Sequence, residues 1–380
     1  MKDYLVFGQP RIEAAEIAEV AACMERAWLG TGPLVSQFEA LVAEYKGAPH
    51  AVALNSCTAG LHLALLVHGI GPGDEVIVPA LTFCATVNVI IHAGATPVLV
   101  DVDPHTFNID PALVRRAITP RTKAIMPVHF AGRACEMDEL LALAREFGLK
   151  IIEDCAHAIE TEYHGRKAGL IGDCGVLSFY STKNVVTGEG GMVLTADADM
   201  AARIRVLALH GMSKDAWRRF SDSGYSHYDV VEIGFKYNMM DLQAAIGLHQ
   251  IQRVEAYWLR RREIWERYNL AFADLPVTLP AALDPTSRHG LHLYTLLIGD
   301  QAPVSRDEFL GALHQRNIGT GVHYRAIPVH PVYQARFGWR PEDFPVSVAI
   351  GETTVSLPLS AKLADADVDD VIAAVRCVLA

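Results

Sequence analysis

Short apolar segments alternate with helical patterns through the N-terminal half of the chain. The apolar runs have the length of buried strands and lie at residues 51–54, 76–78, 97–102, 124–128 and 151–153. Between them, apolar residues recur at helical spacing in residues 56–68, 82–92, 111–118 and 137–147. Continuously apolar strands that alternate with helices are typical of a mostly parallel sheet covered on both faces. We therefore predict an α/β fold with its ligand site at the carboxyl ends of the strands.

The pattern changes in the C-terminal part of the chain. Residues 241–272 keep apolar residues at helical spacing and predict one long helix. After a proline-bounded break, the pattern predicts three strands at residues 291–298, 322–324 and 355–357. It also predicts a helix opened by a capping box at residues 305–315 and a terminal helix at residues 365–379. We expect a large α/β domain in residues 1–250 and a small α+β domain in residues 251–380.

A hairpin pattern carries the first candidate for chemistry. Residues 176–180 and 192–195 predict two strands, and Gly-Glu-Gly-Gly at 188–191 supplies turn residues between them. Lys183 lies just past the first strand, five positions after Ser178. A lysine and a small hydroxyl so placed suit pyridoxal phosphate, which proteins hold as a Schiff base and through its phosphate. An exposed lysine in a hairpin connection would give the same pattern, and exposed lysines are the commonest kind.

Further groups fall at the predicted ends of strands. Asp154 closes one strand, where a carboxylate can pair with a protonated pyridine nitrogen. Residues 55–60 lie between a strand and a helix, where backbone N–H groups and hydroxyls can bind a phosphate. Phe83 follows another strand and could stack on a planar cofactor, and a polar turn at 234–238 precedes the long helix. Singly, these are explained at least as well as helix caps or core residues, but chance explains the ordered set poorly.

Composition limits the possible classes of function. The 380 residues carry a net charge of −11 with both signs interspersed, which disfavours a surface for nucleic acid or membrane. No signal peptide or membrane-spanning apolar stretch is recognisable, so we expect a cytoplasmic protein. The seven cysteines form no Cys-x-x-Cys pair, and the histidines lack the spacing of a metal site. We therefore expect free thiols and no bound metal.

Longer strings resemble one known family. They read GDEVIVPALTF, GATPVLVDVDP, ITPRTKAIMPVHFAG, IIEDCAHA, SFYSTKNVVTGEGGM, GFKYNMMDLQAAIGL and RNIGTGVHYR. From about residue 5 onward, the chain resembles the DegT/DnrJ/StrS family of pyridoxal-phosphate-dependent sugar-nucleotide aminotransferases. It is most similar to members of the UDP-4-amino-4-deoxy-L-arabinose aminotransferase type, which aminate C4 of a 4-keto sugar. The resemblance implies the aspartate aminotransferase (type I) fold, a three-layer, mostly parallel sheet with a smaller α+β C-terminal domain. It also implies a homodimer with shared active sites.

The resemblance assigns roles to residues that contact the cofactor. Lys183 would be the Schiff-base lysine, and Asp154 would be the partner of the pyridine nitrogen. His157 would lie beside the ring hydroxyl of the cofactor, and Ser178 would bind its phosphate.

Other residues would complete the implied site. The backbone at Cys57 and Thr58 would hold the phosphate, although the family more often has glycine or alanine in place of Cys57. Phe83 would stack on the cofactor ring. Asn238 would reach the phosphate in the neighbouring subunit, and His323 would approach the substrate.

The implied reaction moves an amino group from L-glutamate to a keto-sugar nucleotide in two half-reactions, with 2-oxoglutarate as co-product. Lys183 would transfer the proton, which requires that desolvation lower its pKa. A sugar 3-dehydratase of the same fold is one alternative, but histidine replaces the lysine in those enzymes. A regulatory protein that binds the cofactor without catalysis is another, and the reaction with glutamate distinguishes it.

The identity of the sugar, the nucleotide and the aminated carbon stays open at this stage. We expect specificity to come from a loop at 210–229 and from the segment 320–333. There Lys214, Arg325 and His330 could meet a diphosphate or a carboxylate, although charged loop residues are more often simply solvated.

Overall fold

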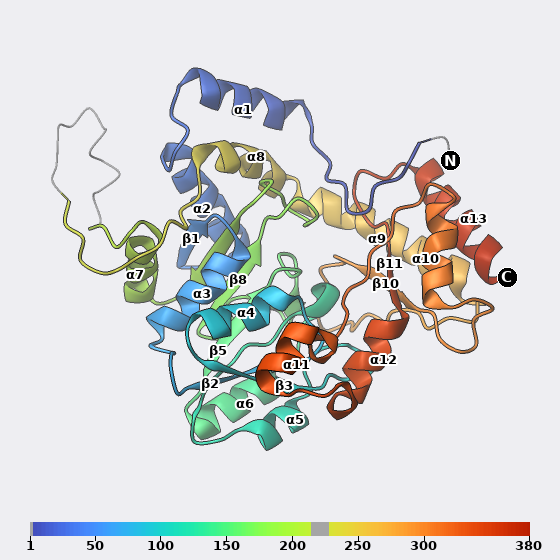
Figure 1. Ribbon diagram of the computed structural model, residues 1–380. Coiled ribbons are helices and arrows are strands. Elements are labelled where there is room, and N and C mark those ends of the chain that lie inside the picture. The colour runs from blue at the N-terminus through green and yellow to red at the C-terminus, as the bar shows by residue number, and fades with distance from the viewer. Residues whose placement is uncertain (1–2, 214–227) are drawn as a thin grey trace.

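The computed structural model describes residues 3–213 and 228–380, and a seven-stranded sheet forms its centre (Figure 1). The strands in spatial order are β1 (His50–Leu54), β9 (Gly191–Thr195), β8 (Cys174–Ser178), β5 (Lys150–Cys155), β4 (Thr122–Ile125), β2 (Glu75–Pro79) and β3 (Thr96–Val100). Neighbouring strands from β8 to β3 are parallel, whereas β9 is antiparallel to both β8 and β1. The predicted mostly parallel sheet is confirmed.

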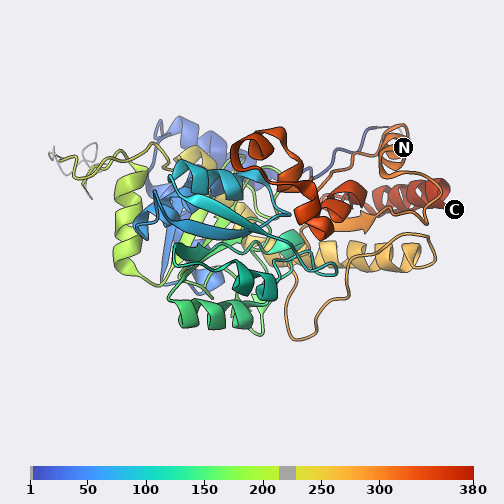
Figure 2. The ribbon, with the colours of Figure 1, turned by 60° about the horizontal axis from the view of Figure 1, so that its bottom comes forward.

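Helices cover both faces of this sheet (Figures 1 and 2). One face packs against α3 (Cys57–Val67), α4 (Cys84–His92) and α7 (Ala198–Ala208). The other packs against α2 (Pro33–Lys46), α5 (Pro111–Ala117), α6 (Met137–Phe147) and α8 (Asp241–Gln252), and α1 (Ala14–Glu25) lies on α8. Strand residues alternate between these cores, as pleated strands require, so that Val76 and Val78 belong to the core beneath α3 and α4 and Ile77 belongs to the core beneath α5 and α6. The three-layer type I fold is therefore confirmed.

A second core lies beside the large sheet (Figure 2). Its elements are α9 (Val254–Phe272), α10 (Arg306–His314), α13 (Asp365–Leu379) and the antiparallel pair β10 (Tyr294–Leu297) and β11 (Thr354–Leu357). The N-terminal arm joins this core, where Leu5 pairs with Ile318. The short elements α11 (Pro331–Phe337), α12 (Pro345–Thr353), β6 (Glu162–Tyr163) and β7 (Arg166–Lys167) complete the fold. The division at residue 250 stays a prediction.

The predicted single helix over 241–272 is wrong. It is two helices, because Arg253 leaves helical geometry with φ −105° and ψ 3°. The Arg253 guanidinium binds the carboxylates of Glu13 and Glu16 at the N-terminal arm. Side chains this distant in sequence leave no mark on helical periodicity, so the break could not be seen in the pattern.

The predicted strand at 322–324 is also wrong. Gly321 makes a two-way backbone bridge with Ser356, and the chain leaves β11 immediately afterwards. The helix predicted from the capping box is confirmed, because the Ser305 hydroxyl accepts from the Glu308 N–H at the start of α10. No helix in the described part of the chain is long and apolar enough to span a membrane.

Candidate active site

A cavity of about 470 Å³ opens where the carboxyl ends of the parallel strands meet the second core. Its walls come from segments that follow β1, β2, β4, β5 and β8, which is where the fold class places ligands. Eight of the nine predicted site residues line it: Cys57, Thr58, Phe83, Asp154, His157, Ser178, Lys183 and His323. Segments far apart in sequence therefore converge on one cavity.

Lys183 lies in a tight turn between β8 and β9. Its backbone N–H donates to the Tyr180 carbonyl at 2.9 Å, and its amine has no hydrogen-bond or ion-pair partner within residues 3–213 and 228–380. Burial lowers the pKa of Lys183 to about 8, although the Cys57 thiol and the Asp154 carboxylate act in the opposite direction. A substantial fraction of this amine is therefore neutral, and so nucleophilic, at physiological pH.

Asp154 is 4% exposed and ends on the same cavity. One carboxylate oxygen accepts from the Thr86 hydroxyl at 2.9 Å, and the other accepts from the Ala156 N–H at 3.1 Å. The Thr86 hydroxyl lies 2.9 Å from that of Thr82, which orients it further. Burial raises the pKa of Asp154, and these two hydrogen bonds act against the rise. The carboxylate is thus fixed in place with capacity to accept another donor.

The N-terminus of α3 forms another wall of the cavity. The Ser56 hydroxyl caps the helix by accepting from the Ala59 N–H at 3.1 Å, while Cys57 and Thr58 form the first turn. Free N–H groups and the helix dipole make such a turn a site for anions. The β9 backbone approaches closely here, because a Cβ on Gly191 would lie 2.4 Å from the Cys57 nitrogen. Cys57 is itself buried, so its thiol leaves the exposed face of the turn free.

His157 and Tyr324 meet across the cavity. His157 Nδ1 accepts from the Ala131 N–H at 3.2 Å, so Nε2 carries the hydrogen and lies 3.0 Å from the Tyr324 hydroxyl. Burial lowers the pKa of His157 well below its usual value, with Lys183 adding to the effect. His157 is therefore a neutral imidazole of defined tautomer that donates toward the cavity.

Phe83 and His323 lie near the same tyrosine. The Phe83 ring is 56% exposed, and its centroid lies 5.8 Å from that of Tyr324. His323 Nδ1 is 2.8 Å from the Ser356 hydroxyl, and burial lowers the pKa of His323 to about 4. An exposed aromatic ring on a cavity wall is available for stacking on a planar ligand.

The ninth predicted residue, Asn238, lies outside this cavity. It borders a separate hollow of about 720 Å³ with Thr31, whose hydroxyl accepts from Asn238 Nδ2 at 2.6 Å. Its Oδ1 is buried without a partner among the described residues. Arg325 and His330 are also absent from the walls of the Lys183 cavity, and Lys214 lies outside the described residues together with most of the predicted loop.

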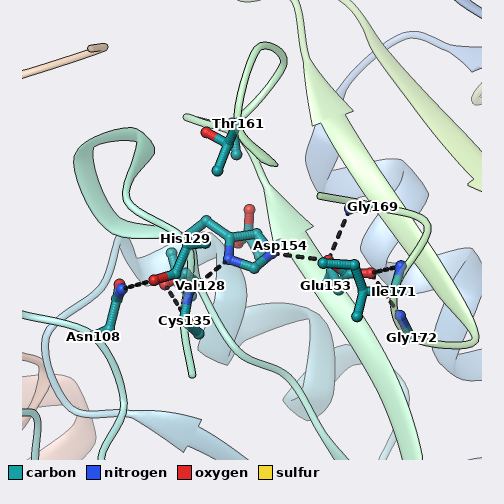
Figure 3. A network of polar contacts seen from close by, with 12 residues as sticks. Asn108, Val128, His129, Cys135, Glu153, Asp154, Thr161, Gly169, Ile171 and Gly172 are labelled. Atoms are coloured by element: carbon teal, nitrogen blue, oxygen red, sulfur yellow. Dashed lines mark hydrogen bonds and ion pairs between the residues drawn. The ribbon is translucent and has the colours of Figure 1, made fainter. Parts of the chain in front are cut away.

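A buried network supports the opposite side of β5 (Figure 3). His129 Nδ1 accepts from the Cys135 N–H at 3.1 Å, so its Nε2 donates to Glu153 at 2.9 Å. Glu153 also accepts from the backbone N–H groups of Gly169, Ile171 and Gly172. Burial acts to raise the pKa of Glu153, but His129 and these N–H groups hold it below its usual value. The network anchors the strand end that presents Asp154.

Sequence reasoning missed several of these groups. Thr86 lies three residues after Phe83 in the first turn of α4, and Tyr324 directly follows His323, so proximity to predicted residues was the available signal. Glu153 was visible beside Asp154, but its partners come from loops that the pattern does not place.

The cavity groups fit pyridoxal phosphate. An uncommitted amine, a buried carboxylate, a helix N-terminus and an exposed aromatic ring match its aldehyde, pyridine nitrogen, phosphate and ring. Fold and site together define a pyridoxal-phosphate-dependent aminotransferase.

Comparison with known proteins identifies the family. The family model described as the DegT/DnrJ/EryC1/StrS aminotransferase family matches residues 10–376, and the chain belongs to this family. It is therefore an enzyme, an aminotransferase, and the cofactor of its family is pyridoxal phosphate. The predicted family, enzyme class and cofactor are confirmed.

Individual relatives cover nearly the whole chain. The spore coat polysaccharide biosynthesis protein SpsC of Bacillus subtilis (strain 168) is 51% identical over 375 residues, which are 98% of this chain and 96% of that protein. The putative sugar aminotransferase Spr1654 from Streptococcus pneumoniae, in its PMP-form, has a TM-score of 0.91 at 35% identity and covers 99% and 97% of the two chains. Helicobacter pylori PseC, an aminotransferase involved in the biosynthesis of pseudoaminic acid, has a TM-score of 0.91 at 27% identity. The match covers 100% of this chain and 99% of that chain.

Proposed function

We propose that this enzyme transfers an amino group from L-glutamate to a nucleotide-linked 4-keto sugar, giving an amino sugar nucleotide and 2-oxoglutarate. The observation that carries the proposal is the uncommitted amine of Lys183 in one cavity with the buried carboxylate of Asp154. The relatives support the sugar, because SpsC is named for polysaccharide biosynthesis and Spr1654 is a putative sugar aminotransferase.

Residues of the large domain would hold the cofactor. Asp154 would accept a hydrogen bond from the ring nitrogen, and the first turn of α3 with Ser178 would bind the phosphate. Phe83 would cover the ring, and the hydrogen on His157 Nε2 would point to the ring hydroxyl. Pyridoxal phosphate, when bound, supplies a ring that withdraws electrons from the carbon that bears the amino group.

Lys183 would carry the proton. In its neutral form the amine would accept a proton from the substrate carbon, and as an ammonium group it would deliver that proton to the reacting carbon of the cofactor within the same half-reaction. The second half-reaction would use the same two transfers in the reverse order. With a pKa of about 8 both forms are accessible near neutral pH. His323 lines the cavity and would contact the substrate.

The rest of the proposal concerns assembly and location. We propose a homodimer in which Asn238 completes the partner subunit's phosphate site, supported by the buried Oδ1 that has no partner among the described residues. All seven cysteines are free, which supports a reducing compartment and hence the cytoplasm.

A half-reaction tests the donor. Cofactor-loaded enzyme mixed with L-glutamate should lose its visible absorbance and release 2-oxoglutarate in an amount equal to the enzyme, whereas D-glutamate serves as the control. Absence of 2-oxoglutarate would overturn the proposed donor.

A substrate panel tests the acceptor. After reaction with glutamate, the enzyme carries the amino group on its cofactor. This form should regain its visible absorbance with a 4-keto sugar linked to UDP, dTDP or GDP, and not with the 3-keto isomers. Recovery with 3-keto sugars instead would contradict the proposed position of amination.

A further inference from the structure

Asn184, the residue next to Lys183, has a fully engaged carboxamide. Its Nδ2 donates to Glu160 Oε2 at 2.8 Å and to the Gly290 carbonyl at 2.9 Å, and its Oδ1 lies 3.0 Å from His292 Nδ1. These partners are 24, 106 and 108 positions away in sequence. The turn that carries the lysine is therefore tied through one side chain to three distant points of the fold.

The first of these points is an ion pair removed from solvent. Glu160 binds the guanidinium of Arg261 in α9, and the two side chains are 0% and 3% exposed. A buried pair with a hydrogen-bonded neighbour has little freedom to rearrange, because either charge left alone would be strongly destabilising. Asn184 thus hydrogen-bonds to a fixed carboxylate whose position is set by the helix that enters the second core.

The contact with His292 connects Asn184 to side chains that line the cavity. Because an amide oxygen can only accept, His292 Nδ1 must carry the hydrogen of their contact. The His292 ring lies 4.3 Å from the ring of His157, which in turn binds Tyr324. The turn that carries Lys183 is therefore linked to His157 through Asn184 and His292, by one hydrogen bond and one ring contact.

We propose that Asn184 is a positioning residue for Lys183: by joining the lysine turn to the Glu160–Arg261 pair and to His292, it holds the amine where the cofactor carbonyl enters. This inference rests on the proposed role of Lys183. Reactions between held groups are sensitive to placement, and a displacement of about 1 Å costs on the order of 10²-fold in rate. Loss of the Asn184 contacts should therefore slow the capture of pyridoxal phosphate markedly while the melting temperature changes little.

The test measures capture by cofactor-free protein, followed as the rise of visible absorbance after mixing with pyridoxal phosphate. Asn184→Ala should capture about 10- to 100-fold more slowly than the wild type. Asn184→Asp should be slower still, because it places a carboxylate against Glu160. The matched control is Asn269→Ala in α9, which removes a half-buried asparagine bonded to the Tyr294 hydroxyl and should capture at the wild-type rate.

A double variant separates positioning from simple loss of structure. Asn184→Asp combined with Glu160→Gln exchanges donor and acceptor across the same contact, and it should recover much of the capture rate lost in Asn184→Asp alone. Asn184→Ala protein that captures at the wild-type rate, or a double variant no faster than the single one, would overturn the proposal. If Asn184→Ala does not fold, the comparison of the double with the single variant decides.

Failure of the proposed function would look different. In that case Lys183→Ala would gain the same visible absorbance as the wild type, whatever the Asn184 variants do. Dependence of capture on Lys183 together with indifference to Asn184 would reject the positioning role alone.

Discussion

The two faces of β5 each present a buried carboxylate with a lysine nearby, and the two pairs differ in their partners. On one face, Glu153 accepts from His129 and three backbone N–H groups, and the Lys46 amine donates to the Ile159 carbonyl at 2.9 Å. On the other face, the Lys183 amine has no partner in the described part of the chain, and Asp154 accepts from a single backbone N–H and one hydroxyl, with the Cys57 thiol 4.0 Å away.

The electrostatic result differs accordingly. Burial lowers the pKa of both lysines to about 8. The carboxylates diverge, because partners hold the pKa of Glu153 below its usual value whereas burial raises that of Asp154. Burial alone therefore does not distinguish a functional group from a structural one. The distinguishing property is unused bonding capacity that faces a cavity.

The two lysines give the largest expected contrast. Lys183→Ala should lower the rate of the glutamate half-reaction by about 10⁴-fold, the upper range for a group that transfers protons, with little change in melting temperature. Lys46→Met should keep the half-reaction and lose stability, by about 1–3 kcal/mol for a carbonyl left unpaired. Single-turnover kinetics and thermal unfolding of both variants check this. Equal losses of rate in both would contradict the comparison.

Substitution of the two carboxylates should likewise affect rate in one case and stability in the other, with smaller changes than for the lysines. Asp154→Asn should lower the half-reaction rate by about 10²–10³-fold, because it removes preorganised charge from the site. Glu153→Gln should cost about 1.5–3 kcal/mol of folding free energy, because the NH2 that replaces one carboxylate oxygen cannot accept from the N–H groups that face it. Denaturant unfolding and kinetics measured on the same preparations distinguish the two outcomes. A stable but inactive Glu153→Gln would break the contrast.

Thr86→Val tests how Asp154 is held. Removal of the hydroxyl that donates to its carboxylate should weaken cofactor affinity about tenfold, whereas Thr86→Ser, which keeps a hydroxyl, should bind as the wild type does. Titration of cofactor-free protein with pyridoxal phosphate measures both. Equal affinity of the valine and serine variants would show that this hydrogen bond does not orient Asp154.

The smallest expected effect is on the titration of Lys183. Competitive acetylation of the cofactor-free protein across pH should give a midpoint near pH 8, because burial lowers the pKa of Lys183. The Asp154 carboxylate favours the ammonium form, so Asp154→Asn should move the midpoint to lower pH by less than about one unit. Glu153→Gln should leave it in place. An upward shift in Asp154→Asn would contradict the assigned electrostatics.

Local pattern was sufficient to predict the architecture and most of the cavity. Strand alternation placed Asp154 and the start of α3 at the same edge of the sheet, and Lys183 followed from the hairpin. Whether those residues formed a site depended on the family resemblance, because an isolated lysine or aspartate is as easily structural.

The features that the sequence did not predict depend on contacts between residues far apart in the chain. Arg253, where the helix breaks, binds Glu13 and Glu16, which are more than two hundred positions away. Thr86 and Tyr324 act through residues that lie close only in the fold. Periodicity describes which face of an element is buried and carries no information on such partners.

Reduction of the cofactor-loaded enzyme with borohydride, followed by digestion and mass spectrometry, shows which lysine holds the cofactor. Lys46 is an internal control, because it is buried with a pKa also near 8 but has an engaged amine. We expect the pyridoxyl group on Lys183 in wild-type protein and on no lysine in Lys183→Ala. A pyridoxyl group on Lys46 or another lysine of the wild type would contradict this assignment.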